Sequence, residues 1–441
     1  MGKRTVLLLL LGFSFKAPAQ EIYTLKKCID YGLKNNRNNA IYVNEKHIAD
    51  AKAREILSDY LPRVSISAAF DNNLRLQQSI IPAGVFGPDE IRGSLSQRYA
   101  TDAVVQAEQV IYNQSLLIGI RANKYLKQQA SLNRIQNREA IIYNISMSYF
   151  QVLVYRQQLE LLQTNSNTYK QQIEIYTLQA GKGILLQKDL DKIVVDYNNT
   201  DSQIRIAQSN LDLAMNELKF EMGHPIADNI LLNTVTQWEM PDDEDTSTTF
   251  SPLERTGYKL ELVNAKILET EQARIKAEGM PVLSVYFKYG AVSFSDHFRD
   301  TYTESFPYAT AGIKLSIPIL DFYNRDSRYR QAKLKHTNAE ENLKLAENRY
   351  ATDYENARTK LVQARANVAI SKRNIELAGQ VLKVTSLQLQ KGTTNLTDWL
   401  NTQYALKEAQ NTYLGSLYLF YQASIDLEKS KGTLQSFYNS L

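Results

Sequence analysis

Two Lys-Gly pairs are the residues of this chain whose types and spacing suggest a shared role. Each pair, Lys182-Gly183 and Lys391-Gly392, is followed by an aspartate six residues beyond its glycine, at Asp189 and Asp398. Glycine permits the left-handed backbone of a tight turn. An aspartate near a helix N-terminus either caps that helix or presents a carboxylate that favours cations. We therefore expect two matched helix–turn–helix tips.

The chain offers no arrangement of residues that is typical of an enzyme. The sequence contains no nucleophile–base set, no phosphate-binding loop and no cluster of metal ligands. The single Cys28 cannot form an internal disulfide, and we expect it to be buried on a helix. We predict a protein that is not an enzyme and that needs no cofactor or metal. The histidines lie too far apart for a zinc site: His47, His224, His297 and His336.

Composition favours long helices. The chain has 441 residues, of which only 18 are glycine and 10 are proline, so residues that break helices are scarce. The net charge of +4 is small, and basic and acidic residues are interleaved along the chain. Such a charge balance suggests no nucleic-acid partner.

A long pattern of apolar and small residues occurs twice. Within residues 141–180 its steps alternate between four and three, which is the seam of a helix coiled against a neighbour. The seam returns 209 residues later, and Gly223 and Gly432 keep the same offset. The sequence therefore predicts an internal duplication built on long paired helices. The seam residues are Ile141, Ile145, Ser148, Val152, Tyr155, Leu159, Leu162, Ser166, Tyr169, Ile173, Tyr176 and Ala180, and then Tyr350, Tyr354, Ala357, Leu361, Ala364, Val368, Ser371, Ile375, Ala378, Leu382, Thr385 and Leu389.

The first residues have the features of a secretory signal peptide. A basic pair, an apolar run and an Ala-Pro-Ala cleavage site occupy residues 1–19. No later segment has about 18 consecutive apolar residues, so no transmembrane helix is expected. We predict an exported protein whose membrane-spanning part, if present, is made of strands.

The mature chain divides into two expected repeats, 20–240 and 241–441. Alternating apolar and polar residues predict two strands in each repeat, and the stretches poor in glycine and proline predict the helices. A loop is expected at 79–97, and Val104-Val105 leaves the facing of the next strand ambiguous. The expected strands are 63–72, 99–111, 282–290 and 308–319, and the long helices occupy 113–222 and 322–431.

Four strands cannot close a membrane barrel, because single-chain bacterial barrels have at least eight strands. Two copies of the chain would supply eight strands and three copies twelve, so we expect an oligomer. Long helices leaving one end of the strands would extend such a barrel as a tube. These properties predict a conduit across the periplasm.

The chain resembles the TolC family of outer-membrane efflux proteins over essentially all of its mature length. The residues that carry the resemblance occur in the family's order and in both repeats. They are the start Thr24 to Asn36, Leu61-Pro62 and Met280-Pro281 before the first strand of each repeat, Ser316-Ile317-Pro318-Ile319-Leu320-Asp321, and the Gly183/Asp189 and Gly392/Asp398 turns.

The resemblance implies a mainly α-helical homotrimer with a membrane β part. Three chains would form a twelve-stranded barrel in the outer membrane, continued by an α-helical periplasmic tunnel. The protein would be the passive exit duct of a tripartite efflux pump or type I secretion system, exporting drugs, metals or proteins. Its partners would be a periplasmic adaptor (membrane fusion protein) and an inner-membrane transporter of RND, ABC or MFS type.

The resemblance also implies roles for individual residues. It puts Lys182, Gly183, Lys391 and Gly392 at the tips that contact the adaptor. The entrance constriction would contain Asp398, with Asp189 and Asn401. The chain departs from the acidic-gate pattern because Asn401 and Leu417 stand where the family has an acidic residue and a basic partner. An ionic latch is therefore not expected. The alternative is a periplasmic coiled-coil scaffold or adaptor without a channel, which would need no paired strands.

Overall fold

The chain folds into two compact units. The computed structural model describes residues 22–85, 87–94, 96–182, 186–233 and 250–441. Unit 1 comprises Met1–Ile41, Ile135–Thr256 and Asn348–Leu441, and unit 2 comprises Tyr42–Arg134 and Gly257–Glu347. Each unit takes segments from both expected repeats, so neither repeat alone is a compact body. The expected signal peptide and Gly183 lie outside the described residues.

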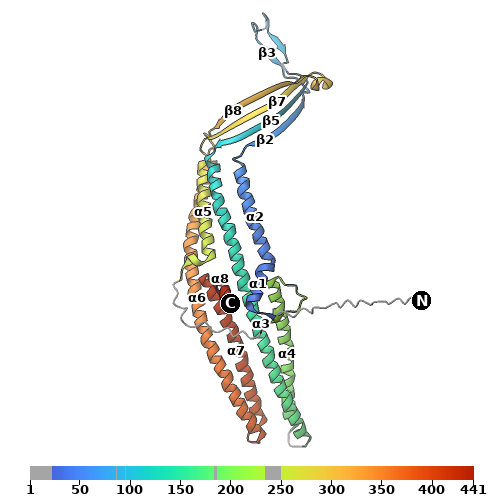
Figure 1. Ribbon diagram of the computed structural model, residues 1–441, viewed down its shortest axis with the longest axis vertical. Coiled ribbons are helices and arrows are strands. Elements are labelled where there is room, and N and C mark those ends of the chain that lie inside the picture. The colour runs from blue at the N-terminus through green and yellow to red at the C-terminus, as the bar shows by residue number, and fades with distance from the viewer. Residues whose placement is uncertain (1–21, 86, 95, 183–185, 234–249) are drawn as a thin grey trace, which may run out of the picture. The chain divides into compact units, whose positions relative to one another are not determined.

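The helices and strands follow the expected order along the chain (Figure 1). The first half contains β1 (Ile22–Tyr23), α1 (Leu25–Asn35), α2 (Arg37–Ser58), β2 (Arg63–Asn72), β3 (Ser79–Ile81), β4 (Ile91–Gly93), β5 (Tyr99–Tyr112), α3 (Gln114–Gly181), α4 (Gln187–Met222) and β6 (Leu231–Leu232). The second half contains η2 (Pro252–Glu254), α5 (Thr256–Ala277), β7 (Val282–Ser295), η3 (Phe298–Tyr302), β8 (Phe306–Ser316), α6 (Asn324–Gln390), α7 (Leu396–Lys431) and α8 (Leu434–Ser440).

Three details differ from the expectation. The loop expected at 79–97 contains the antiparallel pair β3 and β4, because isoleucines on both sides of a glycine-containing turn favour a short ribbon. Strand β7 continues past Gly290 to Ser295, since its pairing with β5 extends that far. Strand β8 ends at Ser316 instead of 319. Pro318 has no N–H to donate to a ladder, and it restricts the residue before it.

The four-three seam is confirmed in both long helices. Every seam residue of α3 and α6 is buried or half-buried. In α3, Leu159 and Leu162 pack with Ala207 of α4. In α6, Leu361 packs with Phe420 and other apolar residues of α7. The seams therefore pair α3 with α4 and α6 with α7.

A larger core holds the first helix pair against the second in unit 1. Cys28 and Ile29 of α1 are fully buried in it, as expected for Cys28. Phe150 of α3 stacks on Tyr421 of α7 with ring centroids 4.3 Å apart and an interplanar angle of 12°. Burial raises the pKa of the Cys28 thiol to about 12, so this cysteine stays protonated and inert.

The return helices of the two halves end in the same way. Gly223 follows α4 and Gly432 follows α7, with φ of 69° and 81°. A Cβ at Gly223 would lie 2.8 Å from the carbonyl oxygen of Asn35, and one at Gly432 would lie 2.8 Å from that of Glu254. Only glycine fits such an approach without strain. The two glycines are 209 residues apart, as are the two seams.

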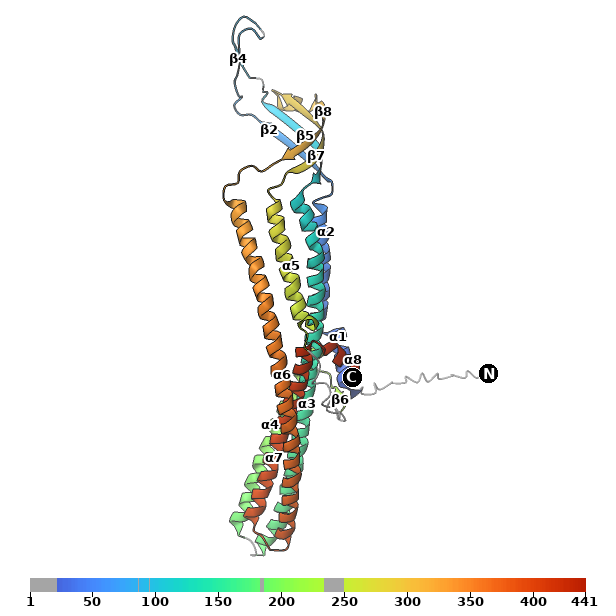
Figure 2. The same cartoon turned by 90° about the vertical axis from the view of Figure 1, so that its left-hand side faces the viewer.

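Unit 2 combines one sheet with helical segments. The strand order is β2-β5-β7-β8, and every pair is antiparallel. Segments of α2, α3, α5 and α6 run lengthwise beside one another below the sheet (Figure 2). Asn123 of α3 donates its side-chain N–H to the carbonyl of Ala53 in α2 at 3.0 Å. None of the helices in the described ranges combines the length and apolar character needed to cross a membrane.

A layer of buried amides interrupts the apolar contacts of unit 1. Asn165 of α3 donates to the Gln410 side chain of α7 at 2.8 Å and accepts from Gln403 at 3.4 Å. All three side chains are buried, and the Oε1 of Gln403 has no hydrogen-bond partner among the described residues. The layer therefore depends on Asn165, which joins both glutamines.

Replacing Asn165 with alanine should destabilise unit 1. Gln403 and Gln410 would remain buried without their partner, and such a loss costs about 1–3 kcal/mol. The midpoint of thermal unfolding, followed by circular dichroism, should fall. Asn167→Ala is the matched control, because Asn167 is exposed two residues further along α3. Equal midpoints for both variants would contradict a stabilising role of the layer.

Candidate functional site

The turn between α6 and α7 is built by Gly392. The N–H of Gly392 donates to the carbonyl of Leu389 at 3.1 Å, and that of Thr393 donates to Gln388 at 2.9 Å. Together these bonds form a Schellman motif, which satisfies the last carbonyls of α6. Gly392 has φ 72°, and nothing lies within 4 Å of a Cβ added there. A substitution would therefore strain the backbone at this turn without clashing. Lys391 is exposed beside it.

Asn395, rather than Asp398, caps the N-terminus of α7. The Asn395 side chain accepts a hydrogen bond from the backbone N–H of Asp398 at 2.9 Å. The Asp398 carboxylate instead accepts from the Thr394 hydroxyl at 3.0 Å, and the residue is exposed. Asp398 thus keeps a solvent-facing negative charge in the first turn of the helix. Asn395 holds the N-cap position, and Asp398 lies in the first turn, where a carboxylate also stabilises the positive end of the helix dipole.

The carboxylate of Asp189, which follows the turn between α3 and α4, is less exposed to solvent than that of Asp398. Lys182 is exposed and its N–H donates to the carbonyl of Gln179 at 3.2 Å. Asp189 lies in the first turn of α4, where its Oδ1 is 3.3 Å from the Nζ of Lys192. The Asp189 side chain is 22% exposed. The charge of Asp189 is thus partly neutralised by a partner on its own helix.

One apolar cluster underlies both turns. Trp399, next to Asp398, is 1% exposed, and its indole N–H donates to the Ser386 hydroxyl at 3.0 Å. The ring of Tyr169 from α3 meets it edge-on, with centroids 6.0 Å apart. Leu190, next to Asp189, belongs to the same cluster. The cluster therefore brings the two turns together in unit 1. Asn401 is exposed and Leu417 is half-buried, both on α7.

Sequence reasoning missed Trp399 and Asn395. Trp399 stands directly after the aspartate of the turn, and this position was the available signal for it. Asn395 stands three residues before Asp398, which is the spacing of an N-cap to the N–H that it binds. That spacing was the available signal for the cap.

Burial shifts the pKa of three titratable groups behind the turns. Burial raises the pKa of Asp196 on α4, and the positive charge of Lys407 on α7 opposes that rise. Burial likewise lowers the pKa of Lys407, and Asp196 opposes the fall. Burial also raises the pKa of Tyr169 to about 12, with a smaller contribution from the negative charge of Asp196. These groups therefore couple α3, α4 and α7 electrostatically just behind the cluster.

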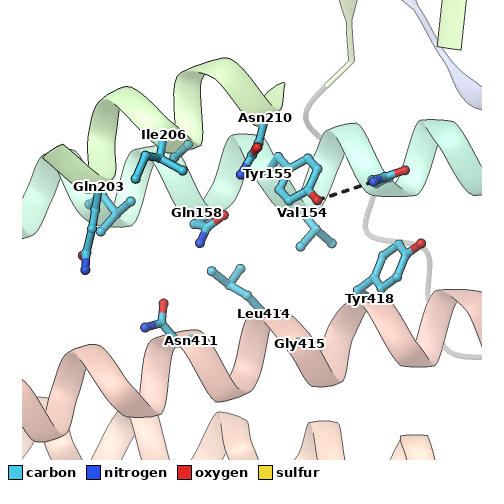
Figure 3. Close-up of a pocket in the computed structure, with 13 residues that line it drawn as sticks. Val154, Tyr155, Gln158, Gln203, Ile206, Asn210, Asn411, Leu414, Gly415 and Tyr418 are labelled. Atoms are coloured by element: carbon cyan, nitrogen blue, oxygen red, sulfur yellow. Dashed lines mark hydrogen bonds between the residues drawn. The ribbon is translucent and has the colours of Figure 1, made fainter. Parts of the chain in front are cut away.

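A cavity of about 480 Å³ lies further along the same helices. Residues of α3, α4 and α7 line it, and Figure 3 shows Gln158, Gln203 and Asn411 around its space. The lining contains amides, aliphatic groups and two tyrosines, and no charged residue. Its complete lining is Gln151, Val154, Tyr155, Gln158, Leu162, Gln203, Ile206, Ala207, Asn210, Asn411, Leu414, Gly415 and Tyr418.

The sheet of unit 2 has one apolar and one polar face. Paired residues of an antiparallel sheet point to the same face. One row across the sheet is Ile66, Val105, Tyr289 and Ala309. The neighbouring row, on the opposite face, is Ser65, Gln106, Lys288 and Thr310. This register resolves the facing of Val104 and Val105, since Val105 lies on the apolar face and Val104 on the other.

The apolar face is uncovered and the sheet has two open edges. Ile66 is 78% exposed and Ile313 is 74% exposed. In the described chain β2 and β8 each have a single strand neighbour, so each leaves one edge unpaired. An exposed apolar face and free strand edges both favour association. The apolar face comprises Val64, Ile66, Ala68, Phe70, Ala103, Val105, Ala107, Val285, Phe287, Tyr289, Ala309, Ala311 and Ile313.

Known proteins resemble the chain in sequence and in fold. Residues 270–433 match the family model described as outer membrane efflux protein. Outer membrane protein TolC of Vibrio cholerae serotype O1 is 19% identical over 339 residues, which are 75% of this chain and 76% of that protein. The outer membrane channel CmeC of Campylobacter jejuni matches with TM-score 0.76 and 16% identity over 93% of this chain and 85% of its own. The outer membrane protein VceC of Vibrio cholerae matches with TM-score 0.75 and 11% identity over 92% and 96%.

The family match lies entirely in the second half of the chain. The matched residues run from within α5 to just beyond α7 and so include β7, β8 and the turn of Lys391, Gly392 and Asp398. The similar channel structures extend the likeness of fold to both halves of the chain. The chain is therefore similar to outer membrane efflux proteins, in sequence over residues 270–433 and to TolC over 339 residues, and in fold over both halves.

Proposed function

We propose that the chain is the passive exit duct of a tripartite efflux pump or a type I secretion system. Three copies would form a twelve-stranded barrel in the outer membrane, continued by a periplasmic tunnel of long helices. The observation that carries this proposal is the exposed apolar face of the four-stranded sheet between two open edges. Lipid would cover that face, and strands of neighbouring copies would pair with β2 and β8.

The long helices support the tunnel part of the proposal. The seams join α3 to α4 and α6 to α7, so each chain would contribute two helical hairpins to a wall. We propose that these hairpins descend from two sequence repeats, 20–240 and 241–441. The matching glycines Gly223 and Gly432 at the ends of the return helices support that division. Energy for export would come from the inner-membrane partner.

The hairpin turns are the proposed meeting point with the partners. The turn residues Lys182, Lys391 and Gly392 are exposed, as a contact surface for a periplasmic adaptor requires. Gly183 would complete this surface. The adaptor would link the duct to an inner-membrane transporter of the RND, ABC or MFS type. Asp398, with Asp189 and Asn401 nearby, would form the entrance, where three copies arrange their carboxylates around one axis.

A charge on the apolar face of the sheet should prevent membrane assembly. Ile66→Asp would put a carboxylate against lipid, at a cost per chain somewhat below the about 2–4 kcal/mol of a lysine or arginine at the bilayer centre. We expect much less protein in the outer-membrane fraction and no trimer on native gels. Ser67→Asp is the matched control, because Ser67 neighbours Ile66 on the polar face. If both variants assemble equally, the apolar face does not contact lipid.

The charge of Asp398 should set the ion selectivity of the entrance. Asp398→Asn keeps an acceptor for the Thr394 hydroxyl but removes the negative charge. Trimers in a planar bilayer should then lose cation selectivity and block by divalent ions. Asp189→Asn should do less, since Lys192 already opposes the Asp189 charge. As the control for capping, Asn395→Ala should leave selectivity intact. Unchanged selectivity in Asp398→Asn would leave Asp398 with only a local role in the turn.

The shape of the α6–α7 turn should matter for export. Gly392→Val forces a β-branched residue to φ near 72°, which costs about 1–3 kcal/mol and distorts the tip. Export and crosslinking to the adaptor should fall while trimer yield stays normal, because the strain is local. Gly379→Val is the control, since Gly379 lies within α6 with open space around it. Normal export by the Gly392 variant would mean that the tip is only a turn.

A further inference from the structure

Two tyrosines on the polar face of the sheet reach across to glycines on the neighbouring strand. Tyr286 of β7 stands opposite Gly312 of β8, and Tyr308 of β8 stands opposite Gly290 of β7. A Cβ added at Gly312 would lie 2.6 Å from the Cζ and the hydroxyl oxygen of Tyr286, and one at Gly290 would lie 3.0 Å from the same atoms of Tyr308. Both tyrosine side chains therefore bend along the sheet instead of standing away from it.

The missing side chains of the two glycines make this arrangement possible. Adjacent strands lie about 4.8 Å apart, so a tyrosine that crosses this gap can rest on the neighbouring backbone only where that residue has no Cβ. Tyr286 and Tyr308 are both half-buried, so part of each ring stays open on the side away from the sheet. An open ring that lies along a surface can stack with another planar ring.

Two lysines stand beside Tyr286. Lys288 follows it by two residues on the same face, and its Nζ lies 5.7 Å from the centroid of the Tyr286 ring. Lys314 is exposed on the same face, opposite Ser284 and two residues beyond Gly312. Diagonal neighbours across two strands are about 7–8 Å apart, which a lysine side chain can span. Neither lysine forms an ion pair within the described ranges of the chain.

The acidic residue next to Tyr286 does not cancel these charges. Glu108 of β5 stands between Tyr286 and Arg63 in the register of the sheet. The Oε2 of Glu108 accepts a hydrogen bond from the side-chain amide of Gln106 at 3.3 Å. Arg63 is itself 3.4 Å from Asp59, so those two charges partly cancel. The two lysines against one carboxylate leave an excess of positive charge around the Tyr286 ring.

The second tyrosine has the opposite surroundings. The hydroxyl of Tyr308 donates to the Oδ1 of Asp102 at 3.2 Å. From Ser67 to Asp71, the paired rows of the polar face carry Asp71 and Asp102 and no basic residue. One face of the described sheet thus sets one tyrosine among positive charges and a geometrically matched tyrosine among negative ones.

We propose that Tyr286, Lys288 and Lys314 form a binding site for planar aromatic anions on the inner wall of the duct. This inference rests on the proposed trimer, in which the polar face lines the lumen. The ring of the ligand would stack on Tyr286, and its carboxylate would accept a hydrogen bond from the Nζ of a lysine. A ligand with both groups makes both contacts at once, whereas a neutral ring or an aliphatic anion makes only one.

Block of the ion current through purified trimers in planar bilayers tests the chemical class of the ligand. The probe is naphthoate, and the control probes are naphthol, which lacks the charge, and cyclohexanecarboxylate, which lacks the aromatic ring. All are added on the side of the sheet, so that they meet it before the entrance at Asp398. Naphthoate should block at concentrations at least about threefold below either control, because each control loses one contact.

Substitutions at the two tyrosines give the matched comparison. Tyr286→Leu should raise the half-blocking concentration of naphthoate about three- to tenfold, since one stacked ring is lost. Tyr308→Leu should change it by less than about twofold, because Asp102 already repels anions there. Tyr286→Phe should keep the block, since it keeps the ring. Changing Lys288 and Lys314 together to glutamine should remove the preference for naphthoate over naphthol.

The position of the ring is tested separately with Gly312→Ala. The added methyl group would displace the Tyr286 ring from the sheet, so block by naphthoate should weaken as it does in Tyr286→Leu. In a chain that already carries Tyr286→Leu, the glycine substitution should have no further effect on the block. If the alanine variant does not assemble, the tyrosine and lysine variants still decide the proposal, because they leave the backbone unchanged.

The outcomes separate this inference from the proposed function. Equal block of the unchanged protein and of Tyr286→Leu, both as trimers, would overturn the site while leaving the duct intact. Equal losses in Tyr286→Leu and Tyr308→Leu would overturn the role of the lysines. A protein that stays monomeric on native gels and forms no channels would refute the proposed trimer, and with it a site on its inner wall.

Discussion

The burial of one seam on each long helix is the constraint on which this structure depends. A helix of the length of α3 or α6 cannot bury an apolar stripe against itself, so it needs a partner along its whole length. In unit 1 the return helices α4 and α7 are those partners, and aromatic contacts such as Phe150 with Tyr421 then join the pairs. The turns are consequently held where the seams end, with Trp399 buried directly behind them.

Periodic features of this fold could be predicted from the sequence, whereas non-local ones could not. Alternation and seam spacing predicted β2, β5 and the long helices, because each depends on residues close together in the chain. The pairing of β5 with β7 joins residues almost 200 positions apart, so no local pattern indicates it. The same pairing extends β7 to Ser295, beyond the end at Gly290 that the alternating pattern predicted. At the site, the turn glycines were predictable from sequence, but the hydrogen bond from Trp399 to Ser386 depends on how α7 meets α6.

The single chain leaves apolar surface uncovered in both of its units, although the two surfaces have different geometry. In unit 2 the uncovered surface is a sheet face with the period of two, as Ile66 and Ile313 show. In unit 1 it includes Ile370, Leu377 and Val384 of α6, which follow one another at steps of seven residues and are 49–60% exposed. Uncovered strand edges need hydrogen bonds as well as apolar contact, whereas helices need only the latter. The sheet therefore demands a partner more strictly than the helices do.

The amide layer of Asn165, Gln403 and Gln410 distinguishes two ways in which α7 can move against α3. Sliding α7 by one helical turn would leave buried amides facing aliphatic side chains, where nothing could bind them. Parting the helices at this level would instead let water bind the same amides, at little cost in hydrogen bonds. An all-leucine seam would have the opposite preference, since sliding would preserve its contacts and wetting would lose them. The layer thus resists shear and tolerates separation.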